Sequence, residues 1–316
     1  MRGRCLKWCT VLTCAIALGA CSAPAPTASG AGGTRTGHPR TAVTEAPSEP
    51  APTAREIALA TTPATGDVDS MMSRGTIRLL VARGQTNYSI DDGQQYGAAF
   101  DAGKAFESFV RVVSDTDAAR LKVVFIPMPP EELVDALTRG RGDIIAGRFA
   151  HTFEREELVA FSEPIVKDVR EALVTGPGVQ PIVSLEDVAG RSIHVRRGSD
   201  HFSSLTRLNG QLAKINKPVC KIVAMDPSLT DEDVLQMVND GRVPVTLVDQ
   251  YLVAAWRPRL DKMAVNPDVS VSQDGIYAWA VRKDSPKLLG LVNEFLRSHD
   301  LQGLDARAVE RWQQKH

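Results

Sequence analysis

Apolar residues in the first half of the chain gather in short runs that alternate with longer mixed segments. The short runs predict strands at residues 76–82 (TIRLLVA), 121–127 (LKVVFIP) and 143–147 (DIIAG). The mixed segments predict helices at residues 100–113 and 129–140, and the second of these begins with proline and glutamates and ends with glycine. Strands that alternate with helices predict an α/β fold with a largely parallel sheet and helices on both faces.

The second half of the chain repeats this pattern. Residues 230–249 predict a helix capped by Thr230 and Asp233, followed by a glycine and a strand. The same helix–Gly–Arg–strand order occurs in residues 131–148, although similarity of this kind also arises by chance. Two similar α/β lobes are the simplest interpretation. Because ligands bind beyond the carboxyl ends of the strands in open α/β sheets, a ligand is expected between the two lobes.

The N-terminal segment predicts export and a lipid anchor. Residues 1–20 have the layout of a secretory signal peptide, with basic residues, an apolar run too short to span a membrane and then small residues. Residues 18–21 (LGAC) resemble a bacterial lipobox, which predicts lipidation of Cys21; the alternative is an ordinary signal peptide with a chance cysteine. Residues 21–70 are rich in Ala, Pro, Thr, Ser and Gly, which predicts a disordered linker behind the lipid.

Composition and charge exclude several classes of function. A hydrophobic content of 43% is that of a globular protein. Residues 1–20 hold three basic and no acidic residues, so their removal lowers the formal net charge from −1 to −4 and leaves no basic footprint for nucleic acid. Beyond Cys21 only Cys220 remains, so we expect no disulfide and a buried thiol. No metal-ligand or phosphate-loop spacing occurs, so no metal and no cofactor are expected.

Seven runs occur in a consistent order over about 240 residues: RGTIRLLV (74–81), DGQQYGAAFDAGKAF (92–106), LVDALTRGRGDIIAG (133–147), TFEREELVAFSEP (152–164), SLEDVAGRSIHVRRGSDHFSSL (184–205), GRVPVTLVDQ (241–250) and YAWAVRKDSPKLLGLVNEFL (277–296). On these runs the chain resembles the family 3 extracellular solute-binding proteins. Within that family it is similar to the non-catalytic N-terminal domain of the membrane-bound lytic transglycosylase F group.

The resemblance implies the two-lobed type II periplasmic binding fold, with a mainly parallel sheet flanked by helices in each lobe. Lobe 1 is expected over residues 74–173 plus 277–316, and lobe 2 over residues 178–272. Two hinge crossings are expected, near residues 171–176 and 276–281, and a single continuous sheet is not.

The resemblance also implies ligand-binding roles. In this family a Thr-x-x-Arg pattern, here residues 152–155, supplies the guanidinium that holds the ligand α-carboxylate, and Arg155 takes that place. Arginine suits the role because its planar fork binds a carboxylate bidentately and stays charged. The alternative is a solvated helix arginine paired with a neighbouring glutamate. Asp249 stands where the family places the carboxylate that holds the ligand ammonium; its alternative is an N-cap of the helix that follows.

Further positions of the resemblance concern the same ligand. Ser199 and Asp200 lie in a turn that matches the one whose hydroxyl and amides meet the carboxylate. Tyr88 matches an aromatic that covers the ligand, unless it is a packed loop tyrosine. Arg148 and Ala150 stand where many amino-acid binders carry small hydroxyl residues, and Asp200 would repel a nearby carboxylate. A peptide, a muropeptide or an acidic ligand therefore fits at least as well as a free α-amino acid.

The internal match adds an expectation that does not depend on the family. Eight residues after the matched glycines, Gly140 and Gly241, lie Arg148 and Asp249. Both are expected just past the carboxyl end of a strand, one in each lobe. Opposite charges attract more strongly as a closing cleft sheds water, so the two side chains are expected to approach each other directly or through a ligand. The alternative is a solvated Arg148 on the rim.

The leading hypothesis is a lipid-anchored, monomeric binding protein of the bacterial cell envelope that closes on a small zwitterionic ligand and has no catalytic residues. It would serve an ABC-type permease or sense cell-wall fragments. A lytic transglycosylase would need a lysozyme-like domain with a catalytic glutamate in a Glu-Ser-Gly context, and the only Glu-Ser, at 107–108, precedes Phe109 in a predicted helix. A dehydratase on this fold and a scaffold with an inactive cleft stay open.

Overall fold

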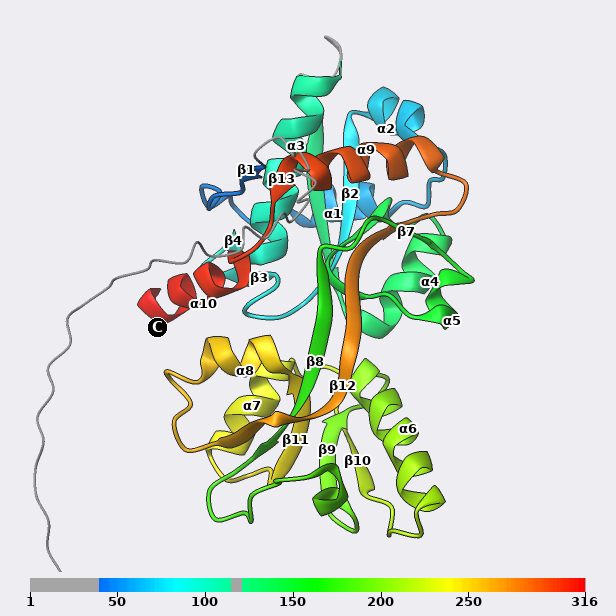
Figure 1. Ribbon diagram of the computed structural model, residues 1–316. Helices are drawn as coiled ribbons and strands as arrows, with labels where there is room; N and C mark the ends of the chain where they lie inside the picture. The colour runs from blue at the N-terminus through cyan, green and yellow to red at the C-terminus, as the bar shows by residue number, and fades with distance from the viewer. Residues whose placement is uncertain (1–39, 115–120, 316) are drawn as a thin grey trace, which may run out of the picture. The chain divides into compact units, whose positions relative to one another are not determined.

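The computed structural model describes residues 40–114 and 121–315, and Figure 1 shows them as two α/β lobes linked by two long strands. The linking strands are β8 (Val166–Thr175) and β12 (Ala264–Val281). Strands and helices alternate along most of the chain, which confirms the predicted α/β class. The predicted signal peptide, Cys21 and the first half of the predicted linker lie outside the described residues.

The first lobe is built on the strand order β12-β6-β2-β5, in which β2 is parallel to β5 and β6, and β12 is antiparallel to β6. β2 (Thr76–Ala82) coincides with the predicted strand. Its Leu79 and Val81 enter one buried cluster and Leu80 another, so the sheet is covered on both faces. The other elements of this lobe are β3 (Ser89–Asp91), β4 (Gln94–Tyr96), α3 (Ala98–Val113), β5 (Lys122–Met128), η2 (Pro130–Glu132), α4 (Leu133–Thr138), β6 (Ile144–Ala150), α5 (Phe153–Glu156), β7 (Ala160–Phe161) and α9 (Pro286–Ser298).

The second lobe is built on the strand order β10-β9-β11-β8. Helix α7 (Asp231–Asn239) is capped by Thr230, whose hydroxyl accepts a hydrogen bond of 3.1 Å from the Asp233 backbone N–H. The predicted cap is therefore confirmed. Cys220 is buried in one of the two apolar clusters of this lobe, as predicted. The other elements are η3 (Leu185–Val188), β9 (Ser192–Arg196), α6 (Asp200–Lys214), β10 (Lys221–Met225), β11 (Val245–Asp249) and α8 (Gln250–Trp256).

Strand pairing runs continuously from β10 to β5, because β8 and β12 pair with each other between the lobes. The expectation that the sheet would not be continuous is therefore wrong. The crossings also lie slightly away from the expected places, since residues 171–175 already pair with β11 and residues 277–281 with β6. β8 and β12 pair between the lobes with repeated register shifts, over residues 166–171 and 272–277. Such irregularities bend and twist a strand pair.

Residues 40–75 contain regular structure that packs on the first lobe. Val43 is buried in its core, and the Arg78 guanidinium donates hydrogen bonds of 2.9 and 2.8 Å to the carbonyl oxygens of Thr62 and Ala64. The expected disordered linker over residues 21–70 is therefore wrong for its second half: a composition rich in Ala, Pro and Thr does not reveal the distant groups that hold the backbone. The elements here are β1 (Thr41–Ala42), which pairs with β13 (His299–Asp300), α1 (Ala54–Thr61) and α2 (Val68–Arg74).

The last helix, α10 (Leu304–Lys315), contacts both lobes. Its Leu304 and Ala308 belong to a buried cluster of the first lobe, whereas Val309 belongs to one of the second. The ring of Trp312 lies 4.7 Å from that of Trp256 on α8. The sequence placed this segment in lobe 1 alone, but its apolar face is shared between the two lobes.

Candidate functional site between the lobes

A cavity of about 730 Å³ lies between the lobes. It is lined where β2, β6, β9 and β11 end and along the crossing of β8 and β12, which is the carboxyl-end position expected for an α/β sheet. The lining is rich in charge. It contains the arginines Arg83, Arg148, Arg155, Arg196 and Arg207, and the carboxylates Glu154, Glu171, Asp200, Asp231, Glu232, Asp249 and Asp274.

Arg155 lies in the wall of the first lobe. Short helix α5 begins at Thr152, whose hydroxyl accepts from the Arg155 backbone N–H at 3.4 Å. The guanidinium lies over the Phe149 ring, 4.4 Å from its centroid, and donates to the Ala150 carbonyl oxygen at 2.8 Å. It also reaches both carboxylate oxygens of Asp200, at 2.8 and 3.1 Å. Arg155 therefore faces the cleft and grips a carboxylate of its own chain.

Asp200 supplies that carboxylate from the second lobe, as the first residue of α6. The preceding Ser199 caps the helix: its hydroxyl donates to the Arg196 carbonyl at 2.9 Å and accepts from the Phe202 backbone N–H at 3.3 Å. Ser199 is buried, and its hydroxyl is engaged in capping α6, although the residue also lines the cavity.

Arg148 and Asp249 both line the cavity, but each has another partner. Arg148 forms an ion pair with Asp305 of α10 and lies over the Tyr251 ring, 3.9 Å from its centroid. Asp249 accepts a hydrogen bond from the Tyr277 hydroxyl. Arg148 and Asp249 are therefore not paired with each other in this structure, because α10 brings a carboxylate from the far end of the chain to Arg148. Their approach in the closed form, directly or through a ligand, stays a prediction.

Tyr88 is not part of the cleft. Its side chain is buried in the first lobe, with its ring stacked on Phe125 at 5.5 Å between centroids and its hydroxyl donating to Gln95 at 2.8 Å. Burial raises the pKa of Tyr88. The expectation that Tyr88 covers a ligand is wrong, since the β3–β4 hairpin gives its hydroxyl a partner inside the lobe. The aromatic rings that line the cavity are Phe149, Phe153, Tyr251 and Tyr277.

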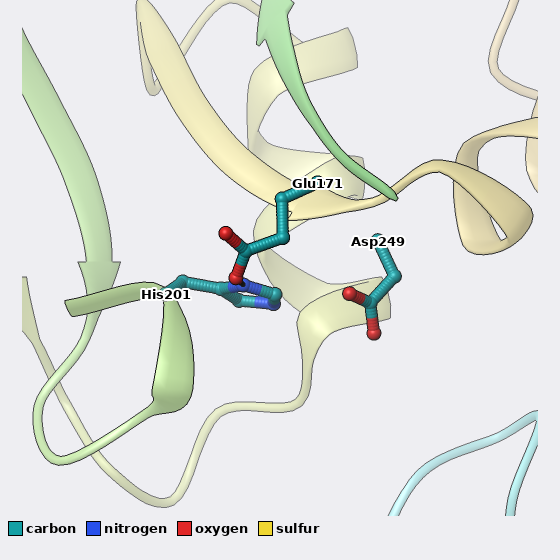
Figure 2. A group of neighbouring side chains, drawn as sticks. All are labelled: Glu171, His201 and Asp249. Carbon is teal, nitrogen blue, oxygen red and sulfur yellow. Dashed lines mark hydrogen bonds and ion pairs between the residues drawn. The ribbon is translucent and has the colours of Figure 1, made fainter. Parts of the chain in front are cut away.

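The wall of the second lobe holds a compact cluster of Glu171, His201 and Asp249, drawn in Figure 2. Glu171 on β8 and Asp249 on β11 are register partners in an antiparallel pair, so their side chains share one face. His201, in the first turn of α6, places Nδ1 2.9 Å from Glu171 Oε1. Its Nε2 lies 3.9 Å from the carboxylate of Asp231, which Arg196 holds at 2.9 and 3.2 Å.

Burial and neighbouring charge shift the protonation of this cluster in opposite ways. Burial opposes the charge on His201, but the hydrogen bond to Glu171 and the carboxylates of Asp249 and Asp231 outweigh it and raise the His201 pKa to about 10. Burial raises the pKa of Asp249 to about 6, against the lowering effect of His201 and of the Tyr277 hydrogen bond. Glu171 and His201 are buried and Asp249 is half-buried, so the three groups interact with one another largely out of water.

Sequence reasoning missed Glu171, His201 and Tyr277 as cleft residues. Glu171 was visible as one charged residue before the apolar run ALVT, but only the register of β8 against β11 places it opposite Asp249. His201 directly follows Asp200, yet its role depends on the angle at which α6 leaves β9. No local pattern indicates Tyr277, which comes from the crossing strand β12.

Comparisons with known proteins agree with this architecture. Residues 82–315 match the family described as bacterial extracellular solute-binding proteins, family 3. The membrane-bound lytic murein transglycosylase F of Desulfosudis oleivorans is 24% identical over 238 residues, which cover 75% of this chain and 48% of that protein. The transglycosylase F of Maricaulis maris is 27% identical over 226 residues, with 70% and 46% covered. The chain thus spans about half the length of the curated relatives it matches.

Solved structures show the same fold. An ancestral arginine-binding protein bound to arginine superposes with a TM-score of 0.59 at 24% identity, covering 76% of this chain and 98% of that one. An amino acid ABC transporter substrate-binding protein from Streptococcus pneumoniae bound to L-arginine gives a TM-score of 0.62 at 17% identity, covering 77% and 98%. The fold is the predicted type II periplasmic solute-binding fold. Within the described residues no helix is both long and apolar enough to cross a membrane.

Proposed function

This chain belongs to family 3 of the bacterial extracellular solute-binding proteins, and we propose that its two lobes close on a small solute that carries both a carboxylate and a cationic group. The observation that carries the proposal is the charge of the two cleft walls. The lining of the first lobe holds three arginines and one glutamate: Arg83, Arg148, Arg155 and Glu154. The lining of the second holds two arginines and five carboxylates, Arg196, Arg207, Glu171, Asp200, Asp231, Glu232 and Asp249, and Asp274 lines the cavity from the crossing strand β12.

Walls of opposite charge suit a zwitterion that bridges them, because attraction across the cleft strengthens as closure removes water. Arg155 is the proposed carboxylate-binding group, and Asp249 with Glu171 the proposed ammonium-binding group. A ligand carboxylate would have to displace Asp200 from the Arg155 fork. That exchange is feasible because the Asp200 side chain is 45% exposed and can turn into water.

Ligand binding is tested by thermal unfolding of the purified chain against a panel of amino acids, dipeptides and wall-derived peptides. A solute that binds the native state raises the melting temperature, and the stabilisation grows with the logarithm of the solute concentration divided by Kd. At 100 times Kd the native state gains about 2.7 kcal/mol, a shift that scanning calorimetry resolves readily. If no member of the panel raises the melting temperature, the proposed binding function is wrong.

The class of solute is proposed from the relatives. Those named lytic murein transglycosylase F favour a wall-derived peptide, whereas the arginine- and glutamine-bound structures favour a free amino acid. The peptide and amino-acid arms of the panel separate the two, and with them cell-wall sensing from uptake through an ABC-type permease. Preference for the muropeptide arm would support an accessory role beside transglycosylases.

Attachment to the membrane is proposed through lipid on Cys21. The Cys21→Ser variant should move from the membrane fraction to the soluble fraction after cell breakage, because lipid chains would supply the attachment. Growth with a labelled fatty acid provides the control: label should appear in the unaltered chain and not in the variant. An unlabelled, soluble wild-type chain would contradict the anchor without affecting the ligand-binding proposal.

A further inference from the structure

Three potential metal ligands converge on the second-lobe wall of the cleft. One donor atom each from Glu171, His201 and Asp249 lie within 4.8 Å of one another, although the residues come from three elements, β8, α6 and β11 (Figure 2). We propose that these three side chains bind a divalent first-row transition-metal ion. This site is separate from the Arg155 guanidinium, but it uses the two carboxylates proposed above to bind the ligand ammonium, so a metal ion bound there would take the place of that ammonium group.

The two carboxylates of the cluster need a positive charge between them, which protonated His201 supplies when no metal ion is bound. Carboxylates directly opposite each other on paired strands repel, and Glu171, which is buried, and Asp249, which is half-buried, occupy such positions. His201 donates to only one oxygen of Glu171. The other, Glu171 Oε2, is buried and has no hydrogen-bond partner among the described residues. A metal ion would neutralise both carboxylates and give that buried oxygen a partner.

The surroundings match those of metal-binding side chains. A metal-bound histidine usually turns its second ring nitrogen toward a carboxylate, and metal-bound carboxylates are themselves hydrogen-bonded. With Nδ1 of His201 toward the ion, Nε2 faces Asp231 at 3.9 Å, and Arg196 fixes Asp231 through two contacts. Asp249 receives the Tyr277 hydroxyl. These outer contacts would hold the donors in orientation.

The donor set indicates the class of ion. One imidazole and two carboxylates suit Zn²⁺ and its neighbours such as Mn²⁺, Co²⁺ and Ni²⁺, whereas all-oxygen sites suit Mg²⁺ and Ca²⁺. Metal–donor distances of about 2.0–2.2 Å require the three donors to draw together by about 1 Å or more, which side-chain rotation can supply. All three residues line the cavity, so the remaining coordination positions would open toward the cleft, where water or a solute could fill them.

The test uses the purified full chain, freed of any affinity tag and stripped with a chelator. Zn²⁺ is titrated calorimetrically against a weak competing chelator, with Mg²⁺ and Ca²⁺ as comparisons. We expect one Zn²⁺ per chain, with much weaker Mg²⁺ and Ca²⁺ binding. Asp249→Asn and Glu171→Gln each remove one ligand with little change of shape, and each should weaken Zn²⁺ by at least about tenfold, the lower limit seen for the outer contacts of such sites. His194→Gln, which alters a second-lobe histidine outside the cavity lining, should leave the affinity unchanged.

Replacement of Zn²⁺ by Co²⁺ gives a spectroscopic readout: visible absorption of a low-coordinate cobalt site should appear on the unaltered chain and disappear in His201→Gln. Circular dichroism in chelator checks that each variant is folded. If His201→Gln does not fold, loss of the cobalt absorption is tested in Asp249→Asn instead. Absence of stoichiometric Zn²⁺ binding to the unaltered chain overturns the proposal. The proposal is also overturned if both carboxylate variants bind Zn²⁺ as tightly as the unaltered chain. Loss of binding in His151→Gln would overturn it too, because that result would place the ion at His151 and Glu156 instead.

Discussion

The two walls of the cleft differ in how completely their charged groups are paired within the protein. On the first wall, the Arg155 guanidinium contacts a carbonyl oxygen, both oxygens of Asp200 and the face of Phe149. On the second, two carboxylates stand on adjacent strands and Glu171 Oε2 is buried without a hydrogen-bond partner among the described residues. A paired group costs little when nothing binds, whereas an unpaired buried one carries a desolvation penalty. The first wall is therefore satisfied by the protein itself, and the second gains from a bound cation.

The largest expected effect comes from removing the centre of the second wall. In chelator, His201→Gln should lower the free energy of unfolding by about 3–5 kcal/mol, as for other buried charged pairs that lose one partner. Glu171 would then lose its cationic partner while Asp249 still faces it. Urea unfolding measures the loss, and His194→Gln is the control. Adding Glu171→Gln should recover part of the stability; a double variant no more stable than His201→Gln would contradict this account of the wall.

Arg155 tests the first wall. Arg155→Ala should weaken a carboxylate-bearing ligand by roughly 2–5 kcal/mol, as when one partner of a buried charge pair is lost. This corresponds to about 30-fold to several-thousand-fold in Kd, which calorimetric titration measures. Arg139→Ala is the matched control, because Arg139 forms an exposed ion pair with Asp135 outside the cavity lining. Equal affinity in the Arg155 variant and the control would remove Arg155 from the binding site.

Asp200 sharpens the comparison because it competes with the ligand for Arg155. Asp200→Asn should strengthen a carboxylate-bearing solute about tenfold, or roughly 1.4 kcal/mol, since the fork no longer has to release a charged partner. A solute without a carboxylate should be unaffected. Asp274→Asn is the control, because Asp274 also lines the cleft but its side chain accepts a hydrogen bond from the Ser272 hydroxyl instead of pairing with Arg155. Weaker binding of the carboxylate in Asp200→Asn would show that Asp200 helps to hold the ligand instead of excluding it.

The smallest expected effect concerns Arg148. A double-mutant cycle between Arg148→Met and Asp305→Asn should give a coupling of about 1 kcal/mol in unfolding free energy, because the pair is partly buried. The same cycle with Asp249→Asn should give less, within about 0.5 kcal/mol of zero, since no direct contact joins Arg148 and Asp249. A larger coupling to Asp249 than to Asp305 would restore the direct approach that the internal sequence match predicts.

Local features of the sequence were sufficient for several elements of the fold. The apolar run of residues 76–82 became β2 without change, and Thr230 with Asp233 began α7 as expected. Such elements are predictable because the hydrogen bonds and side-chain periods that form them join residues close in the chain. The family resemblance then predicted two lobes with a cleft between them. It also predicted that Arg155, Asp200 and Asp249 face this cleft, and all three line the cavity.

Partners within the cleft were decided by tertiary structure. Arg148 meets Asp305, 157 residues away, because α10 packs across both lobes. Glu171 faces Asp249 because of one strand register, and a shift of one residue would turn it to the other face of the sheet. Nothing local in the sequence distinguishes Tyr88 from Tyr277, yet Tyr88 is buried in the core of the first lobe whereas Tyr277 lines the cleft. A residue type determines which interactions a side chain can make, but the long-range packing of lobes, strands and the last helix determines which partner it meets.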